Sequence, residues 1–358
     1  MADRSPRVLV RPDIELATWT HGEGRPLIAP PHAPWFTIES TRRVAERMGM
    51  DRHPLHLRGQ RTVRYDARGM GQSSGHMDAA LDVQIEDLGA VIDATAAGPV
   101  ALMAMRHAGP VAIAYTAANP QRVSQLILWC TYASGPDDFF DAKRFRAIQR
   151  LLDLDWDLFL STAAYELVGW SSTQAPELVQ ILRDADLHPA DIVRGWQQLA
   201  RNDVTPLLAQ IRVPTLVLER ADGRSPGPNV ARRLAGAIPG AQLALLPGSS
   251  PLPFAETPGL IQRTLSDTLD PPRPMALGPI ARRTGIGARR PDAAYTPTPR
   301  ESEVLQLVAR GLSNHDIAAE LSISAATVRN HLTALFGKLK VRNRTAAVAR
   351  ARDEGLLE

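Results

Sequence analysis

Residues 313–339 place polar side chains that could read DNA bases on one face of a predicted helix. The second of two short helical patterns keeps its apolar residues on one face, and the other face carries Arg329, Asn330 and Thr333. Arginine can donate two hydrogen bonds to guanine, asparagine can read adenine, and threonine can contact a thymine methyl group. Side chains that could neutralise DNA phosphates lie in or just after the same segment: Thr327, Lys338, Lys340, Arg342 and Arg344. The pattern predicts recognition of double-stranded DNA in the major groove.

Short helices are expected to position these side chains. Thr298 and Glu301 form a helix-start signal, Gly311 ends that helix, and Ser313 starts the next one. A last helix is expected over residues 343–354. The residues predicted to face inward are Val304, Leu305, Val308, Ile317, Ala318, Leu321, Val328, Leu332, Leu335, Phe336 and Leu339. An ordinary solvated helix also has a polar outer face, so periodicity alone leaves DNA binding and a plain helical domain open.

Charge is distributed unevenly along the 358 residues. Residues 1–270 contain 27 Arg plus Lys and 30 Asp plus Glu, a net charge of −3, whereas residues 271–358 contain 14 basic and 8 acidic residues, a net charge of +6. A basic segment behind an acidic one favours a polyanionic partner for the C-terminal part. Because Pro, Gly and Arg are concentrated in residues 271–295, we predict a globular domain at 1–270, a linker at 271–295 and a helical domain at 296–358.

Composition excludes several classes of protein. Apolar residues make up 44% and charged residues 22%, which is typical of a globular protein. Apolar stretches such as Val100–Met105 are far shorter than the roughly 20 residues of a membrane helix. The single Cys130 excludes an internal disulfide and a zinc site built on several cysteines, and its apolar neighbours predict a buried, inert thiol. No signal peptide is visible, so we expect a cytoplasmic protein with no cofactor, metal or membrane partner.

Residues 296–357 resemble the LuxR/GerE-type DNA-binding domain without a gap. The resemblance lies in the motifs Thr298-Pro-Arg-Glu-Ser-Glu-Val-Leu, Gly311-Leu-Ser-Asn, Ile317-Ala-Ala-Glu-Leu, Thr327-Val-Arg-Asn-His-Leu and Val341-Arg-Asn-Arg-Thr. The family implies a bacterial transcription factor that joins the nucleoid when bound to DNA, usually a homodimer on a palindromic operator. It also implies that Arg329, Asn330 and Thr333 face the major groove.

Residues 7–270 alternate between short apolar runs and helical patterns. Helices are expected at 83–97, 109–119 and 229–237. Strands are expected at 8–10, 14–20, 26–29, 61–65, 100–105, 126–129, 215–218 and 242–246, and the first two of these could form a hairpin. This order predicts an α/β fold, with a mostly parallel sheet covered by helices on both faces.

Phrases spread over the same part resemble the α/β-hydrolase family, in the order in which that family has them. They are Arg64-Tyr-Asp-Ala-Arg-Gly-Met-Gly-Gln-Ser, Ala117-Ala-Asn-Pro-Gln-Arg-Val, Asp203-Val-Thr-Pro-Leu-Leu, Val213-Pro-Thr-Leu-Val-Leu and Ala237-Ile-Pro-Gly-Ala. The resemblance implies an α/β-hydrolase-like sheet with a helical cap at about residues 131–205. A fold does not by itself imply an activity.

The residues that carry catalysis in that family are missing at the matching positions. The nucleophile lies in a Gly-x-Ser-x-Gly turn, and the matching turn here, Ala104 to Ala108, has Arg106 in place of serine and alanine in place of both glycines. The base position falls on Pro251, and the acid position on Gly223, with Asp222 one residue earlier. A protonated guanidinium cannot attack a carbonyl, and proline accepts no proton. We therefore expect no catalytic residues, and the two alanines also put the sharp turn in question.

A cleft over the strand ends could persist without its chemistry. Arg106 would lie at a helix N-terminus, where it could bind the carboxylate or phosphate of a small effector with two hydrogen bonds. The alternative is an Arg106–Asp222 ion pair that fills the former active site. The resemblance also implies that the backbone N–H of His107 belongs to an oxyanion hole. Aromatic residues of the cap are commonly core, but they could also line a pocket: Phe139, Phe140, Phe145, Trp156, Phe159, Tyr165, Trp170 and Trp196.

These patterns together predict a DNA-binding transcriptional regulator whose N-terminal domain is a non-catalytic, hydrolase-like sensor. The expected partners are double-stranded DNA, a small and possibly acidic effector, and a second copy of the chain. Two alternatives remain open: a hydrolase with a non-standard site fused to a DNA-binding domain, and a front domain that only dimerises. The ligand-binding candidates are His32, Trp35, Arg106, His107, Trp170 and Asp222, and the DNA-binding candidates are Thr327, Arg329, Asn330, Thr333, Lys338 and Arg344.

Overall fold

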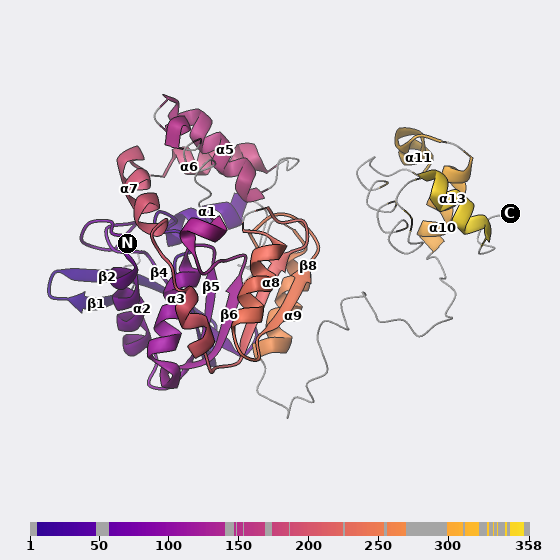
Figure 1. Cartoon of the computed structure of the whole chain (residues 1–358). Coiled ribbons are helices and arrows are strands. Elements are labelled where there is room, and N and C mark those ends of the chain that lie inside the picture. The colour runs from indigo at the N-terminus through magenta and orange to yellow at the C-terminus, as the bar shows by residue number, and fades with distance from the viewer. Residues whose placement is uncertain are drawn as a thin grey trace. The chain divides into compact units, whose positions relative to one another are not determined.

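The chain forms two compact units, one containing residues up to 269 and the other residues from 299 onward (Figure 1). The computed structural model describes residues 6–47, 57–139, 147, 149–152, 154–168, 174–185, 187–224, 226–253, 256–269, 299–310, 312–321, 328, 332, 335, 341 and 344–353. The predicted linker at 271–295 lies outside the described residues. Within the described ranges, no helix is long and apolar enough to cross a membrane.

The larger unit is built on a mostly parallel sheet, as predicted. Its described strands are β1 (Arg7–Arg11), β2 (Ile14–His21), β3 (Arg25–Ala29), β4 (Gln60–Tyr65), β5 (Val100–Met105), β6 (Val123–Trp129), β7 (Thr215–Arg220) and β8 (Gln242–Leu246). They form one sheet in the order β1-β2-β4-β3-β5-β6-β7-β8. The pairs β1–β2 and β2–β4 are antiparallel, and the remaining neighbours are parallel. The predicted hairpin and the predicted strands are confirmed.

Helices cover both faces of this sheet, which explains why its central strands are apolar throughout. The covering helices are α2 (Leu81–Thr95), α3 (Ala108–Ala118), α8 (Pro228–Ala237) and α9 (Pro258–Leu269), and shorter turns are η1 (Pro120–Arg122), η2 (Gly135–Phe139) and η3 (Thr205–Gln210). Successive strand side chains point to opposite faces. In β5, Leu102 packs in the cluster that includes α2, α3 and α8, and Met103 packs in the cluster that includes α9. A parallel strand covered in this way reads as a continuous apolar run.

A helical cap lies over the carboxyl ends of the parallel strands (Figure 1). Its described helices are α5 (Trp156–Val168), α6 (Ala175–Arg183) and α7 (Pro189–Leu199), and α1 (Ile38–Arg47) packs beside them. One apolar cluster joins the four helices and includes Val44, Leu160, Leu178 and Ile192. The cap is therefore held together by a core of its own, separate from the two clusters that flank the sheet.

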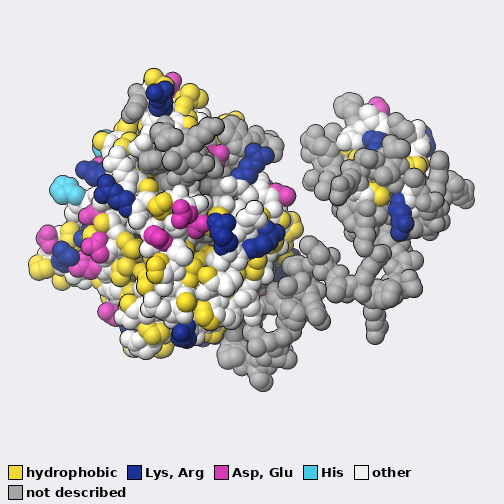
Figure 2. Space-filling view, viewed as in Figure 1, with side chains coloured by type: hydrophobic (Ala, Val, Ile, Leu, Met, Phe, Trp, Pro, Cys, Tyr) yellow, Lys and Arg dark blue, Asp and Glu magenta, His cyan; other side chains and the backbone are white. Residues whose placement is uncertain are grey.

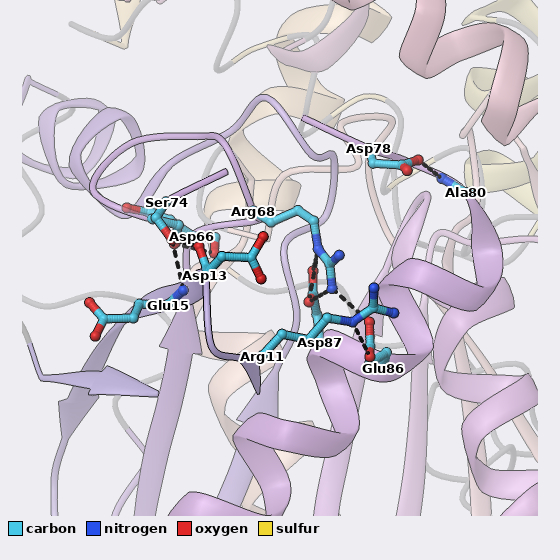
Figure 3. Close-up of polar contacts among 11 residues, drawn as sticks. Arg11, Asp13, Glu15, Asp66, Arg68, Ser74, Asp78, Ala80, Glu86 and Asp87 are labelled. Atoms are coloured by element: carbon cyan, nitrogen blue, oxygen red, sulfur yellow. Dashed lines mark hydrogen bonds and ion pairs between the residues drawn. The ribbon is translucent and has the colours of Figure 1, made fainter. Parts of the chain in front are cut away.

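A polar network anchors the chain where it leads into α1. Asp66 follows β4 and accepts a hydrogen bond from the N–H of Ile38 at 2.6 Å. Two residues later, the buried Arg68 donates from Nε to both carboxylate oxygens of Asp87 on α2, each at 3.1 Å (Figure 3). These bonds fix the loop after β4 to the start of α1 and to α2.

Charged side chains of both signs share the visible surface of the larger unit. Figure 2 shows acidic and basic groups interspersed over that face. Several of them form exposed ion pairs, such as Arg183 with Asp157 at 2.8 Å. Exposed pairs of this kind contribute about 0–1 kcal/mol each to stability. The charges that could bind a ligand selectively are the buried and half-buried ones.

The smaller unit has the helical core that its periodicity predicts. Its described helices are α10 (Pro299–Ala309), α11 (Asn314–Glu320) and α13 (Arg344–Asp353). The predicted start of α11 at Ser313 is confirmed, because Ser313 and Asp316 cap each other with side chain to backbone bonds of 3.3 and 3.1 Å. Residues predicted to face inward that are buried are Val304, Leu305, Val308, Ile317, Ala318, Val328, Leu332 and Leu335. Thr298, Phe336 and Leu339 lie outside the described residues.

Candidate ligand cavity at the strand ends

The chain turns sharply at Arg106, between β5 and α3. Arg106 has a φ of +49°, in the left-handed region that residues other than glycine rarely adopt. Its N–H donates to the carbonyl oxygen of Trp129 at 3.2 Å, and its own carbonyl oxygen accepts from the N–H of Gly109 and from the hydroxyl of Thr131. A Cβ atom at Gly109 would lie 1.8 Å from the Thr131 hydroxyl oxygen, so α3 can pack this closely only with glycine there. The sharp turn that the two alanines put in question is therefore retained.

The backbone N–H of His107 is already used within the chain. It donates to the carbonyl oxygen of His32 at 3.1 Å. The side chain of His107 is 3% exposed, and its Nδ1 lies 2.8 Å from the hydroxyl of Tyr132. Burial, assisted by the charge of Arg106, lowers the pKa of His107 well below its usual range. A position implied to stabilise an oxyanion thus holds a neutral, internally bonded residue.

A cavity of about 120 Å³ lies between this turn and the cap. Arg106, His107 and His32 line it from the strand ends, and Glu166 and Thr162 line it from α5. The rest of the described lining is apolar: Ala33, Trp35, Phe36, Phe139, Phe159, Leu160, Ala163, Leu167, Leu182, Leu187, Ile192 and Trp196. A mostly apolar concave surface with a few polar groups is the usual form of a small-molecule site.

Aromatic rings in the lining contact one another mostly edge to face. The rings of Trp35 and Trp196 are 6.0 Å apart at an interplanar angle of 69°, and those of Phe159 and Trp196 are 5.5 Å apart at 72°. The guanidinium carbon of Arg106 lies 5.2 Å from the ring centre of Phe139. A cationic group and several rings therefore meet at one cavity, and a cation above a ring is a favourable contact.

His32 is the second neutral imidazole of the lining. It is 9% exposed, and burial, followed by the charges of Arg64 and Arg106, lowers its pKa to about 3. Its Nε2 has no hydrogen-bond partner among the described residues. A buried polar atom without a partner is uncommon in a folded protein and calls for an explanation.

The loop that would carry the base is fastened from inside by Arg220. This side chain is fully buried and donates to the carbonyl oxygens of residues 247, 250 and 256 at 2.7–2.9 Å. Its guanidinium carbon also lies 5.1 Å from the ring centre of Trp129. The carbonyl oxygen of Pro251 accepts from Nε1 of Trp129 at 2.5 Å. Pro251 supplies no proton acceptor in its side chain, and its loop is closed by internal bonds.

The predicted ion pair between Arg106 and Asp222 is wrong. Both residues are described, and no ion pair joins them. Asp222 is exposed, and its N–H donates to the carbonyl oxygen of Gly248 at 3.0 Å. Glu219, which is 1% exposed, is an acid close enough for the charge of Arg106 to act on it. Burial raises the pKa of Glu219, and the charge of Arg106 acts in the opposite direction. Sequence reasoning missed Glu219, although a carboxylate that ends an apolar strand run was a visible signal.

Cys130 is buried, as predicted. Cys130 follows β6, is buried, and is a free cysteine. Burial, and then the charge of Glu219, raise the pKa of this thiol well above its usual range. The thiolate form that would react is therefore suppressed.

Four of the six ligand-binding candidates meet at the cavity. His32, Trp35, Arg106 and His107 all line it. Asp222 does not belong to the described lining, and Trp170 lies outside the described residues. Of the cap aromatics, the structure brings Phe139, Phe159 and Trp196 to the cavity, a selection that periodicity alone does not make.

Most of the DNA-binding candidates lie outside the described residues, namely Thr327, Arg329, Asn330, Thr333 and Lys338. Arg344 is described and half buried. Its guanidinium donates to Oδ1 of Asn314 at 3.2 Å and to the carbonyl oxygen of Leu312. These bonds tie α13 to the start of α11, so the phosphate contact predicted for Arg344 competes with a structural role whose partners sequence reasoning missed.

Two family models match the chain. Residues 47–258 match the model described as alpha/beta hydrolase fold, and residues 297–351 match the model described as bacterial regulatory proteins, luxR family. An esterase from Exiguobacterium antarcticum matches with a TM-score of 0.62 at 17% identity, covering 74% of this chain and 98% of that one. An enol-lactonase from Burkholderia xenovorans matches with a TM-score of 0.60 at 19% identity, covering 74% and 99%. At these identities the likeness shows the fold alone.

Two curated relatives match a short stretch of this chain. The transcriptional regulatory protein DesR of Bacillus subtilis is 48% identical over 58 residues, which are 16% of this chain and 29% of the relative. The CsgBAC operon transcriptional regulatory protein of Escherichia coli is 50% identical over 56 residues, which are 16% and 26%. The chain thus spans less than a third of the length of these relatives.

Proposed function

The chain belongs to the alpha/beta hydrolase fold family and carries a luxR-type helix-turn-helix domain at its C-terminal end, and on this basis we propose that it is a DNA-binding transcriptional regulator whose hydrolase-like unit senses a small molecule without cleaving it. The DNA partner follows from the luxR-type domain, because the relatives matched there are named as transcriptional regulatory proteins. A homodimer on a palindromic operator is part of the same proposal, since helix-turn-helix dimers bind two half-sites.

The observation that carries the proposal is the state of three positions that catalysis would need. Arg106 occupies the nucleophile turn, and Pro251 occupies the base position. The N–H of His107 already donates to the carbonyl oxygen of His32 at 3.1 Å. Acyl transfer needs a nucleophile, a base and donors for the developing oxyanion. The unit has the shape of a hydrolase but lacks these three groups.

The cavity supports a sensing role over a purely dimerising one. It is about 120 Å³ in volume and combines Arg106 with aromatic walls. A unit that only paired two copies would gain nothing from this space, since an unfilled cavity costs stability. We therefore assign the cavity to an effector.

An effector bound there can regulate only by binding one DNA-binding state more tightly than another. Coupling free energies between two sites are typically about 1–3 kcal/mol, which corresponds to a change of about 5–150-fold in DNA affinity. The same coupling changes effector affinity by an equal factor when DNA is bound. This reciprocity gives the proposal a quantitative form.

Two assays on one preparation of the full chain test the proposal. Release of nitrophenolate from p-nitrophenyl acetate reports acyl transfer, and fluorescence anisotropy of a duplex that the chain selects from a random pool reports DNA binding. We expect ester turnover at the buffer rate, both before and after Arg106→Ala. We also expect salt-dependent DNA binding that Asn330→Ala weakens by about tenfold or more.

Either half of the proposal can fail independently in these assays. Saturable turnover that Arg106→Ala removes would contradict the non-catalytic unit and favour a fused hydrolase with a non-standard site. DNA binding that is unchanged by both Arg329→Ala and Asn330→Ala would contradict base reading by this helix. Lys338→Ala is the matched comparison, because loss of a phosphate contact weakens binding to all sequences about equally.

A further inference from the structure

We propose that the cavity binds a small aromatic carboxylate, with its carboxylate against the Arg106 guanidinium and a single ring among the aromatic side chains. This inference rests on the proposed function, because it names the ligand class of the same cavity. The charge, the ring and the size of the ligand each follow from a different set of contacts.

The charge follows from the cation at the strand ends. Arg106 lines the cavity immediately before α3, an 11-residue helix whose amino end carries partial positive charge. A guanidinium has five N–H donors in a planar fork, so it can keep a contact within the chain and still offer two donors to a carboxylate. His32 and His107 are buried and neutral, so they add no positive charge. Glu166 is the acidic residue of the described lining, and an amine probe tests the opposite charge.

The ring follows from the walls. Trp35, Phe159 and Trp196 meet edge to face at 5.5–6.0 Å, and Phe139 lies beneath the Arg106 guanidinium. Aromatic rings prefer offset or edge-to-face contacts with one another, so a ligand ring can add a further contact of the same kind to this cluster. Gly195 on α7 makes room for the arrangement, since a Cβ there would lie 3.1 Å from the Trp35 ring. An aliphatic ligand would fill the space without these contacts.

The size follows from the volume. The cavity measures about 120 Å³, and an engineered apolar cavity of about 150 Å³ is known to hold benzene. On this scale the enclosed space suits at most a single six-membered ring, so fused rings or long acyl chains exceed it and the acidic arm must extend out to Arg106. The carboxylate arm reaches toward the half-buried Arg106, where the lining becomes polar.

The test is a calorimetric titration of the full chain with four matched probes: phenylacetate, phenylacetamide, cyclohexylacetate and phenylethylamine. We expect saturable binding of phenylacetate. The amide and the amine should bind about tenfold more weakly or worse, because they lose the charge-assisted bonds to Arg106. Cyclohexylacetate should bind about threefold more weakly, because it keeps the charge and loses the aromatic contacts.

Variants separate the role of Arg106 from general damage to the fold. Arg106→Gln should weaken phenylacetate about tenfold or more and leave phenylacetamide unchanged, and retained amide binding shows that the cavity is intact. Arg194→Gln is the matched control, since Arg194 is an exposed arginine of α7 outside the described lining, and it should change neither ligand. Ala163→Phe fills the cavity from α5 and should abolish binding of both ligands.

The proposal is overturned if acid and amide bind equally, if the amine binds best, if Arg106→Gln leaves the preference for the acid intact, or if phenylacetate fails to bind at millimolar concentration. None of these outcomes touches the proposed function, which the ester and DNA assays test. Conversely, ester turnover would remove the non-catalytic sensor while leaving a preference for aromatic acids intact. The two inferences can therefore fail separately.

Discussion

The resemblance to the α/β-hydrolase family would place the nucleophile at the turn at Arg106 and the base in the loop at Pro251, and the structure treats these two places differently. The turn keeps its left-handed backbone, with φ at +49°, and its side chain lines a cavity. The loop is bonded from inside instead, by a fully buried Arg220 that donates to three of its carbonyl oxygens. The turn at Arg106 thus contributes a cationic side chain to a cavity, whereas the loop at Pro251 is held by hydrogen bonds from Arg220.

If the proposed loss of both catalytic side chains is correct, such a loss does not by itself close a site. Three hydrogen bonds shape the turn, and they join the backbone of Arg106 to Trp129, Gly109 and the Thr131 hydroxyl. Because they involve only the backbone of Arg106, they do not depend on the side chain at this position. The loop is stabilised by an arginine from the neighbouring strand end. We infer that ligand binding depends on the turn at Arg106 and not on the loop at Pro251.

The largest expected effect on stability comes from replacing Arg220, which holds the loop at Pro251. Arg220→Met removes a fully buried side chain that donates to three carbonyl oxygens of the loop, and we expect it to lower the free energy of unfolding of the larger unit by about 3 kcal/mol or more. Urea unfolding followed by circular dichroism measures the loss. Arg232→Met, at an exposed position on α8, should stay within about 0.5 kcal/mol of the parent. Equal losses in both variants would show that Arg220 does not fasten the loop.

A smaller loss of stability is expected when the pH is lowered, because two buried histidines lie at the turn. The folded-state pKa of His32 is lowered to about 3, and that of His107 is also lowered, both mainly by burial. Below the unfolded-state pKa of about 6.5 the unfolded chain binds more protons, so stability falls as the pH falls. From about pH 7.5 to about pH 5.5 the buried His32 should cost about 1.4 kcal/mol, and His107 acts in the same direction.

The pH series is best read as a difference between variants. Glu219 works in the opposite direction, because its raised pKa makes the folded state bind protons more readily as the pH falls. Comparing the parent with His32→Asn cancels this contribution. The variant should lose about 1.4 kcal/mol of the acid-dependent change over the same range. Parallel pH profiles for the two proteins would mean that His32 is not held neutral in the folded state.

The smallest effect isolates the strain at the turn. Arg106→Gly and Arg106→Ala both remove the guanidinium and its contact with Phe139, and only glycine adopts a φ of +49° without strain. We expect the glycine variant to be about 1 kcal/mol more stable than the alanine variant in thermal or urea unfolding. If alanine were equally stable, the left-handed backbone at this position would carry no strain.

The strands and helices of the larger unit could be predicted because burial leaves a direct mark on sequence. The run from Val100 to Met105 is apolar at every position since both faces of β5 are covered. The start of α11 was predictable for a similar local reason, because Ser313 and Asp316 are three residues apart and cap each other. Features that depend on neighbours in sequence were thus within reach.

The features that escaped prediction depend on contacts between distant segments. The N–H of His107 meets the carbonyl oxygen of His32, 75 positions away, and no local pattern marks that bond. Sequence reasoning considered Asp222 as the acid near Arg106, whereas the structure places Glu219 there. This difference depends on where β7 ends, which periodicity places only to within a few residues. Glycine preference alone put the sharp turn in question, although bonds from neighbouring strand ends hold it.

Amide hydrogen exchange of the full chain, with and without phenylacetate, tests the contrast between the turn at Arg106 and the loop at Pro251 most directly. We predict that the ligand slows exchange in residues 32–36, in the turn at 106–109 and in α5 and α7, and that the loop at 247–253 exchanges as it does in the free chain. Slowing confined to residues 247–253, or no slowing near Arg106 at saturating phenylacetate, would contradict the account.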